Sequence, residues 1–465
     1  MSAALASATE FQTIGPRYLG IGGAGVARST GAMAPYWNPA GLAFNQKTVA
    51  STVSAGVGLQ LGNGLADTVD KIDAIDFNNA KALTGVQAQD QAALGEAVKL
   101  LSATDNLKGH LTVRANAVFG NQIGNFGVGL YSTFEGASRP EVDMVNIAPA
   151  SAGGTKLSVA DLNTATAGAA ASTAFFTADE AAAINAAFTA LGANGADVKN
   201  TLDAYLAANP GGVTSAEATQ TLLKLAAALD PASTSAVLDT NKSILINRAL
   251  ALFEVPVSYG HSIDIGKYGQ LGLGVSAKLM KGRVYASSIR VFDVDGSSGI
   301  VDQIKDSYTD STTWGVDLGA LWKLSTVSVG VVAKNLNSPT FDGVAGTEIK
   351  VKPQVRVGAT WSPTKWLSVA ADADVTSNET MVDGIKSQVI GGGLELMPTE
   401  WFQLRVGAYK NIAEDDSPVA TAGLTFGTKW VNLDLDAAAA TKTAKYDGKS
   451  YPEEARVQVA LNFMF

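Results

Sequence analysis

Apolar and polar residues alternate along most of the chain from residue 48 onward. In the first such segment, serine and glycine residues separate Val53, Ala55, Val57 and Leu59. A period of two predicts β-strands with one apolar and one polar face. The pattern occurs in fourteen segments, and the last one ends on Phe465. The predicted strands are residues 48–62, 110–120, 123–136, 248–260, 268–294, 309–323, 326–336, 352–362, 365–376, 384–396, 400–411, 417–427, 430–440 and 454–465.

The connections between these segments alternate in length. Short connections follow every even-numbered strand, and long ones follow every odd-numbered strand. This rhythm is typical of bacterial outer-membrane barrels, which have an even number of strands, tight periplasmic turns and longer outer loops. The sequence therefore predicts an all-β fold, a 14-stranded antiparallel transmembrane β-barrel that crosses the bacterial outer membrane many times. Both chain termini are expected on the periplasmic side, and outer-membrane lipid is expected around the wall.

Tryptophan placement supports the same fold. Five of the seven tryptophans lie beside a predicted short turn, namely Trp322, Trp361, Trp366, Trp401 and Trp430. Transmembrane barrels carry aromatic belts at the bilayer interfaces, where the ring is buried and the indole N–H stays in contact with water. The positions therefore predict a belt at the short-turn end.

Two strands depart from the simple pattern. Pro256 lies inside the fourth strand and has no N–H to donate, so we expect a bulge or an early strand end there. The fifth strand is unusually long. A break near Lys281 and Gly282 would divide it and raise the number of strands to fifteen or sixteen.

The alternation stops in two long connections, residues 63–109 and 137–247. Capping boxes of the form Thr-x-x-Glu begin at Thr177 and Thr214, and each precedes Ala- and Leu-rich sequence. The predicted helices are residues 177–193, 196–208 and 214–229, with another around 81–102. By strand order both insertions are extracellular, where they form either a cap or an apolar entrance for a hydrophobic ligand.

Composition narrows the function. The 465 residues carry 34 Lys and Arg against 43 Asp and Glu, and this net charge of −9 argues against a nucleic-acid partner. The chain has no cysteine and two histidines, so we expect no enzyme, no cofactor and no metal site. His110 and His261 fall at opposite rims of the barrel, where we interpret each as a solvated residue. Charged residues make up 17% of the chain, against about 25% in soluble domains, which indicates that lipid covers part of the surface.

Charged residues alternate with the apolar ones in several strands and are predicted to line the lumen. They are Arg114, Asp317, Arg356, Asp372, Asp374, Arg405, Asp434, Asp436 and Arg456. Because both signs occur, they form either a hydrated interior or salt bridges that hold a plug.

Residues 1–47 contain no strand and are predicted to plug the barrel formed by residues 48–465. Met1 to Glu10 lack the basic and long apolar regions of a signal peptide, so we interpret them as the start of a mature or trimmed exported chain. Gly20, Gly22 and Gly25 match GxGxxG, but no strand precedes them and no βαβ unit follows, so a nucleotide site is not expected. The small residues instead allow close approach to the lumen wall.

Asn38, Pro39 and Ala40 are predicted to make the tightest turn of the plug. Asparagine bonds its own backbone, proline fixes φ and alanine leaves room, so the triplet can hold one rigid conformation. Arg17 is expected to anchor the plug by pairing with one of the inward aspartates.

These residues resemble the FadL-type outer-membrane family. The resemblance rests on Leu-Gly-x-Gly-Gly-Ala-Gly-Val-Ala at residues 19–27 and on Tyr-Trp-Asn-Pro-Ala-Gly-Leu at residues 36–42, ahead of fourteen strands. The hatch motif that the resemblance implies is Gly22, Gly23, Gly25, Asn38, Pro39 and Ala40. Sister groups with similar hatch sequence are the PorV-type secretion barrels and the TraF-like barrels.

The resemblance implies import of long-chain fatty acids or hydrocarbons, with a hydrophobic small molecule as partner. The alternative is a protein-binding barrel of a secretion or conjugation apparatus, in which the helical insertion holds a protein client. The terminal Phe465 resembles the signal that the barrel-assembly machinery recognises during biogenesis.

Overall fold

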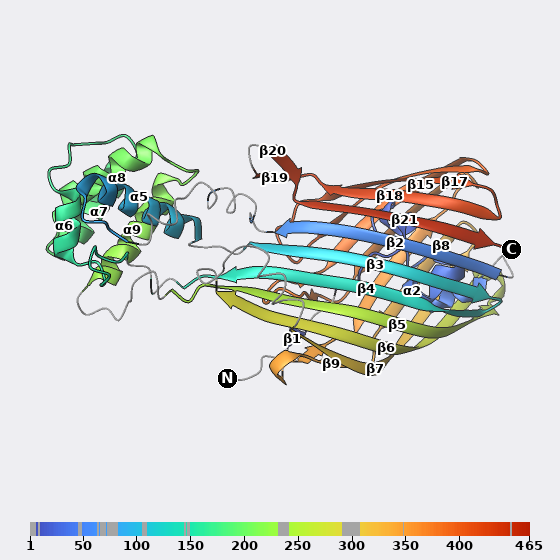
Figure 1. Ribbon diagram of the computed structural model, residues 1–465. Coiled ribbons are helices and arrows are strands. Elements are labelled where there is room, and N and C mark those ends of the chain that lie inside the picture. The colour runs from blue at the N-terminus through green and yellow to red at the C-terminus, as the bar shows by residue number, and fades with distance from the viewer. Residues whose placement is uncertain are drawn as a thin grey trace.

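The computed structural model describes residues 6–7, 10–44, 49–62, 65, 71, 82–104, 109–143, 146, 149–230, 241–290, 307–346, 348–446 and 449–465. Fourteen strands pair antiparallel in sequence order, and the pairing of β8 with β11 and of β21 with β2 closes them into a barrel (Figure 1). The predicted 14-stranded antiparallel barrel is confirmed. The strands are β2 (Val49–Gly62), β3 (His110–Ile123), β4 (Phe126–Glu141), β5 (Ile244–Asp264), β6 (Gln270–Arg290), β7 (Tyr308–Leu324), β8 (Val327–Lys334), β11 (Gln354–Trp361), β12 (Leu367–Asp374), β15 (Val389–Thr399), β16 (Phe402–Asn411), β17 (Val419–Gly427), β18 (Val431–Ala440) and β21 (Glu454–Met464).

The two ends of the barrel differ. Tight connections such as Gly124–Asn125 between β3 and β4 lie at one end, here called the short-turn end, together with the C-terminus (Figure 1). Long connections lie at the other, the long-loop end. The N-terminal strand β1 (Ala6–Ser7) pairs with β10 (Glu348–Lys350), which belongs to the long connection between β8 and β11. The first described residues, Ala6 and Ser7, therefore lie at the long-loop end, and the expectation that the N-terminal segment begins at the short-turn end is wrong.

Two expected strand defects are absent. Pro256 stands opposite Lys278 in an unbroken β5–β6 ladder, so the expected bulge or early strand end is wrong. Its missing N–H is accommodated on the other side, where pairing of β5 with β4 skips from Glu254 to Val257 without a change of register. The division of the fifth strand is also wrong, because β6 continues through Lys281 to Arg290.

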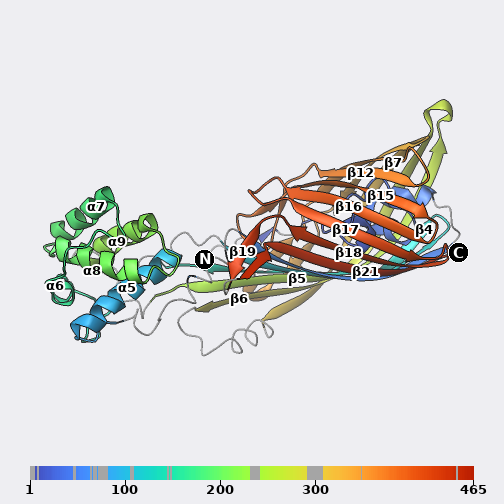
Figure 2. The same cartoon turned by 90° about the horizontal axis from the view of Figure 1, so that it is seen from above.

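The two insertions form one helical bundle beyond the long-loop end (Figures 1 and 2). Its helices are α5 (Gln87–Thr104), α6 (Val159–Thr166), α7 (Ala178–Ala190), α8 (Gly195–Ala208) and α9 (Ser215–Leu229). The capping boxes of Thr177 and Thr214 are present as the sequence predicts. Helix α6 was not predicted, because its box begins at Ser158 and uses Asp161 where the usual pattern has Glu or Gln.

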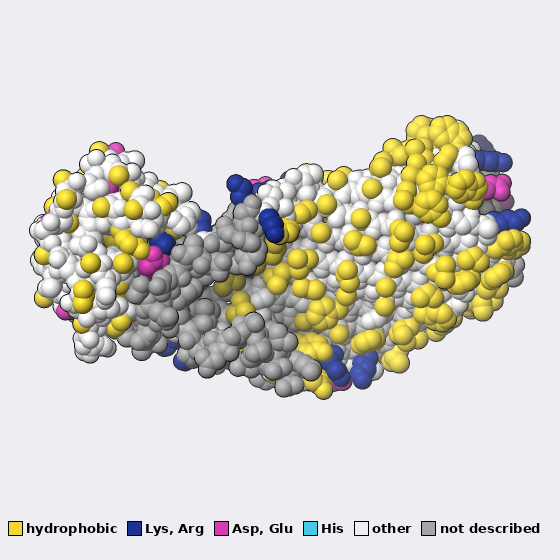
Figure 3. Space-filling view, turned by 45° about the horizontal axis from the view of Figure 1, so that its top comes forward, with side chains coloured by type: hydrophobic (Ala, Val, Ile, Leu, Met, Phe, Trp, Pro, Cys, Tyr) yellow, Lys and Arg dark blue, Asp and Glu magenta, His cyan; other side chains and the backbone are white. Residues whose placement is uncertain are grey.

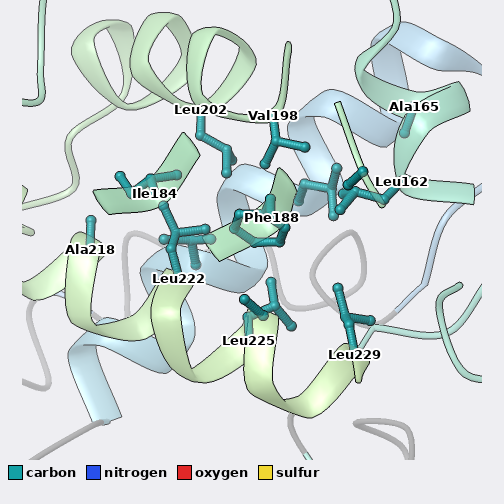
Figure 4. Packing of buried hydrophobic residues seen from close by; sticks show 14 of the residues in the cluster. Leu162, Ala165, Ile184, Phe188, Val198, Leu202, Ala218, Leu222, Leu225 and Leu229 are labelled. Atoms are coloured by element: carbon teal, nitrogen blue, oxygen red, sulfur yellow. The ribbon is translucent and has the colours of Figure 1, made fainter. Parts of the chain in front are cut away.

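The bundle has its own apolar core. Ile184 and Phe188 of α7 point toward Val198 of α8 and Leu222 of α9, and all four side chains are buried (Figure 4). Among the described residues of the bundle, the exposed large apolar side chains are Val86 and Leu223. The Leu-rich faces are therefore used within the bundle, which argues against an apolar entrance built from these helices.

The outer face of the barrel wall is apolar (Figure 3). Outward side chains such as Val57 of β2 and Val257 of β5 are 65% and 60% exposed. The residues that alternate with them in the same strands face the lumen and are buried or small. Trp361, Trp366 and Trp401 are more than half exposed close to the short turns. Exposed apolar side chains on a closed barrel indicate a lipid-facing surface. None of the described helices is long and apolar enough to cross a membrane.

Candidate functional site: the plugged lumen

Residues 10–44, here called the plug, run through the barrel lumen. They form the short helical elements α1 (Pro16–Leu19), η1 (Gly31–Met33), α2 (Ala34–Trp37) and η2 (Pro39–Phe44). The plug has an aromatic core in which Phe11, Tyr18 and Tyr36 surround the fully buried Trp37. From the wall, the hydroxyl of Tyr131 donates to the carbonyl of Ala32 at 2.6 Å. The plug is thus a folded element that is bonded to the barrel.

Glycines allow the plug and the wall to touch backbone to backbone. Gly22 has φ +68°, and a Cβ at this position would overlap the carbonyl oxygens of Gly392 and Ala408. On the wall, a Cβ at Gly391 would overlap the carbonyl of Gly22, and one at Gly407 would lie 2.7 Å from the Gly22 nitrogen. A left-handed φ and the absence of space both require glycine at position 22.

The other two hatch glycines have different functions. Gly23 has φ +80° and completes the same turn. Gly25 leaves room for the indole ring of Trp37. The N–H groups of Gly25 and Val26 both donate to Oδ2 of Asp372, at 2.8 and 2.9 Å. The predicted lumen residue Asp372 therefore holds the plug backbone.

The Asn-Pro-Ala triplet joins the plug to itself and to the wall. Asn38 is fully buried, and its Nδ2 donates to the carbonyls of Val26 at 3.0 Å and Ala320 at 3.1 Å. Its Oδ1 accepts from the Ala40 N–H at 3.0 Å, which fixes the first turn of η2 behind Pro39. A side chain on the facing wall is excluded here too, because a Cβ at Gly319 would overlap Asn38 Oδ1.

Glu395 on β15 is the principal anchor of the plug. Arg17 binds it with two bonds, Nε to Oε2 at 3.0 Å and Nη2 to Oε1 at 2.7 Å. Arg28 donates to Oε1 at 2.8 Å, and Arg405 of the wall lies 3.8 Å away. The side chain of Glu395 is fully buried. The expectation that Arg17 pairs with an inward aspartate is wrong, since the partner is this glutamate, which sequence reasoning missed.

The remaining predicted lumen residues pair with one another. Arg356 binds Asp374 through Nε at 2.6 Å and Nη2 at 3.0 Å. Arg405 binds Asp436 in the same two-bond manner at 2.9 and 3.0 Å, and its Nη2 reaches Asp434 at 3.3 Å. The first pair joins the neighbouring strands β11 and β12, whereas Arg405 reaches from β16 across β17 to β18.

Arg114 and Arg456 face the start of the plug. Arg114 Nε lies 2.5 Å from Glu10 Oε1, and Arg456 Nη2 lies 3.9 Å from the same oxygen. Arg456 Nε also donates to Glu454 at 2.5 Å. Among the predicted lumen residues, Asp372, Arg114 and Arg456 thus contact the plug. The bonds of Arg356 and Arg405 to aspartates instead connect strands of the wall.

A second cluster of buried charged side chains lies closer to the long-loop end of the lumen, and only its Asp317 was predicted from the sequence. Lys278 Nζ is 2.7 Å from Glu254 and 3.1 Å from Asp317. All three side chains are less than a tenth exposed. Lys278 and Glu254 were missed although the signal was present, since both stand at lumen-facing positions between outward apolar neighbours.

An apolar layer fills the lumen above these charges, at the long-loop end. On the wall it consists of Leu250, Leu252, Met280 and Val284, with Ala137 at its margin. Two loop hairpins fold over it, β9 (Thr340–Asp342) with β10, and β13 (Asn378–Glu379) with β14 (Lys386–Ser387). From these connections Phe341, Ile349, Val351, Met381 and Val382 complete the layer, and all are buried.

The short-turn end differs in chemistry. Beneath the plug lies a cavity of about 470 Å³ that is lined by serine, threonine, asparagine, arginine and lysine side chains and by apolar ones such as Met33, Phe44 and Met464. From the long-loop end to the short-turn end, the lumen therefore changes from an apolar layer to paired charges to a cavity with a mixed lining.

The two histidines differ in their surroundings. His110 is 4% exposed and lies against Gly62, so the interpretation of a solvated rim residue is wrong for it. His261 is exposed, but it pairs with Leu273 inside β5 instead of lying in the turn. The two residues are on opposite ends of the barrel, as the sequence predicts.

This geometry defines a class: a closed antiparallel barrel whose lumen is filled by its own N-terminal segment. The sequence model of the family described as "F plasmid transfer operon, TraF, protein" matches residues 35–374, so the chain belongs to this family. The match is to the TraF-like sister group that was named with the resemblance. Among the curated proteins compared, none matches the chain.

Solved barrels of similar architecture exist at low identity. The Ralstonia pickettii toluene transporter TbuX is 12% identical, with 98% of this chain and 99% of that chain covered and a TM-score of 0.46. The P. putida toluene transporter TodX is 10% identical, with the same coverage and a TM-score of 0.44. A Pseudomonas aeruginosa FadL homologue is also 10% identical over the same shares, with a TM-score of 0.44. Two of these structures are thus toluene transporters and the third is a FadL homologue.

Proposed function

We propose that the protein is an outer-membrane channel, not an enzyme, for uptake of hydrophobic small molecules such as hydrocarbons or long-chain fatty acids. In this proposal the long-loop end faces outward, because barrels of the outer membrane place their short turns in the periplasm. The apolar outer wall and the tryptophans near the short turns support a position within a bilayer.

The apolar layer at the long-loop end carries the proposal. A polar pore has no need for wall residues such as Leu250, Leu252 and Met280 on its inner face. Here they form an apolar surface that two loop hairpins cover from outside. A hydrophobic molecule that displaces Met381 and Val382 finds equivalent contacts on the wall, so exchange of loop for ligand costs little.

The plug is a second barrier to the passage of a hydrophobic molecule through the lumen. Its bonds to Glu395, Asp372 and the wall carbonyls close the lumen below the apolar layer. Passage therefore requires that part of the plug rearrange. We expect Asn38→Ala combined with Pro39→Ala to lower uptake while barrel assembly stays nearly intact.

The test is an uptake assay in cells that carry Val382→Asp. A carboxylate in the loop makes the apolar layer unfavourable for a hydrocarbon, so uptake of a radiolabelled hydrocarbon should fall several-fold. The control is Val86→Asp, the same change at an exposed valine of the bundle, which should leave uptake at the wild-type level. Equal uptake by both variants, with normal amounts of folded barrel, would reject the channel proposal.

A second candidate is a protein-binding barrel of a conjugation or secretion apparatus. The observation that favours it is the self-contained bundle beyond the long-loop end, together with membership of a family described by a plasmid transfer operon. Affinity purification from native membranes distinguishes the two candidates. A stoichiometric protein client that is lost when residues 149–230 are removed would favour this second function.

A further inference from the structure

The cavity at the short-turn end is unlike the apolar layer at the opposite end. Its volume of about 470 Å³ is within the range of small-molecule sites. The plug contributes Arg17 and Arg28, and the wall contributes Lys323, Thr360 and Asp434. Apolar side chains such as Phe44 and Met464 complete the lining, so the cavity suits a ligand that has both an apolar part and a polar group.

Near this cavity, the described positively charged side chains outnumber the described carboxylates by one. Three arginines, Arg17, Arg28 and Arg405, are offset by the carboxylates of Glu395, Asp434 and Asp436. Lys323 has no ion pair within the part of the chain that the structure describes, and its Nζ lies 4.4 Å from the ring centroid of Phe44. Arg17 also remains accessible, with 42% of its side chain exposed. Counted over the described residues alone, the site therefore has an excess positive charge of one, which suits a singly charged anion.

Some hydrogen-bond donors around the cavity also lack an acceptor among the described residues. Arg28 Nη1, Ser54 Oγ and Thr360 Oγ1 are buried, and each lacks a hydrogen-bond partner among the described residues. All three side chains line the cavity. Unsatisfied buried donors are costly. Ser54 on β2 stands across the barrel from Thr360 on β11, so a single carboxylate is an acceptor for Arg28 and Thr360 but not for Ser54 as well.

We propose that this cavity binds a molecule that carries a single carboxylate and enters from the short-turn side. The carboxylate pairs with Lys323 and accepts bonds from Arg28 and Thr360. Two sources share this chemistry, a free small acid and the C-terminal carboxylate of a peptide. The site is independent of the proposed uptake, since its ligand need not pass the plug.

The experiment is isothermal titration calorimetry with the full chain in detergent. The probes are benzoate against the isosteric benzamide, and the peptide Ala-Ala-Phe with a free against an amidated C-terminus. We expect a charged probe to bind at least about tenfold more tightly than its neutral counterpart, because the pairing of Lys323 with a carboxylate adds a charge-assisted bond. Benzoate binding identifies a small acid, and binding of the free peptide alone identifies a chain end.

Two variants and a control complete the test. Lys323→Gln should weaken binding about tenfold and Thr360→Val less, because each removes one bond to the carboxylate. Lys429→Gln removes a lysine from a short turn outside the cavity and should bind like the wild type. The proposal is overturned if neither acid binds at millimolar concentration, or if Lys323→Gln binds as well as the control while it still shows the gel mobility of a folded barrel.

Discussion

At the scale of single residues, the plug packs closely against the wall because both surfaces have glycines, which carry no side chain, at the contact. Gly22 is the clearest case, since its backbone is left-handed and its Cβ position is occupied by wall carbonyls. Gly124, in the short turn between β3 and β4, has φ +55° with nothing within 4 Å of a Cβ. The two glycines thus share the backbone requirement but differ in the space around them.

We therefore expect Gly22→Ala to destabilise the protein more than Gly124→Ala. Both variants carry the cost of a left-handed residue, about 1–2 kcal/mol. Gly22→Ala adds about 1–3 kcal/mol of overpacking. Thermal unfolding in detergent, followed by tryptophan fluorescence, measures the difference. Equal unfolding temperatures for the two variants would show that the plug does not contact the wall as described.

Glu395 supports a second prediction at this scale. Replacing it by Gln leaves Arg28, which is 10% exposed, without its carboxylate. Breaking a buried ion pair costs about 3–5 kcal/mol, so we expect Glu395→Gln to loosen the plug and expose it to protease in detergent. Adding Arg28→Gln should restore part of the protection. If the losses of protease protection caused by Glu395→Gln and by Arg28→Gln add up in the double variant, the two side chains do not form a direct ion pair.

The alternation in the sequence was sufficient to place the inward charges, because a side chain's face follows from its position in a strand. Their partners did not follow from it. Arg17 pairs with Glu395, which is 378 positions away in the chain. Partner choice depends on the barrel's closure and the plug's path, and neither is encoded in a local pattern.

At the scale of elements, the bundle helices depend on buried polar contacts as well as on their apolar faces. Asp203 of α8 is fully buried, and it accepts bonds from the Ser172 hydroxyl and from the N–H groups of Ala174, Phe175 and Phe176. Burial raises the pKa of this carboxyl, but the hydrogen bonds outweigh it and hold the pKa below its usual range.

A depressed pKa makes the bundle sensitive to acid. The stability that Asp203 contributes is present above the unfolded pKa of about 3.9 and is lost as pH falls through the lower folded value. We expect Asp203→Asn to cost about 1–3 kcal/mol at pH 7 and to remove this part of the acid sensitivity. Helix melting followed by circular dichroism at pH 7 and below pH 4 measures both.

The control for this prediction is Asp179→Asn, which removes an exposed carboxylate from the first turn of α7. It should change stability by at most about 0.5 kcal/mol. If Asp203→Asn melts like this control at pH 7, the hydrogen bonds to Asp203 contribute nothing to the bundle.

Element boundaries were predictable where a local rule fixes them. The boxes of Thr177 and Thr214 mark the starts of α7 and α9 because capping is a contact within four residues. Pro256 shows the limit of such rules. Its lost hydrogen bond affects only the pairing with β4, and the β6 side keeps the strand in register.

At the scale of the whole molecule, the bundle and the C-terminus lie at opposite ends of the barrel (Figure 1). If the long-loop end faces outward, protease added to intact cells should cut within residues 149–230 and leave a C-terminal tag protected. Cleavage that requires permeabilised cells would reverse the proposed orientation. A periplasmic protein of known protease sensitivity serves as the control for intact cells.

The fold at this scale was predictable from strand count and loop rhythm, but the three layers of the lumen were not. The loops that carry Phe341 and Met381 give no sign in the sequence that they fold inward. Likewise, the start of the plug lies at the long-loop end because β1 pairs with β10, a contact between segments more than 300 residues apart.

The central claim is that the apolar layer receives a hydrophobic molecule inside the lumen. The most direct measurement is a crystal structure of the protein soaked with a brominated hydrocarbon, with bromine located by its anomalous signal. The account predicts a bromine peak between the Met381–Val382 loop and the wall residues Leu252 and Met280. Bromine confined to the outer wall, with the loop closed over an unchanged apolar layer, would contradict it.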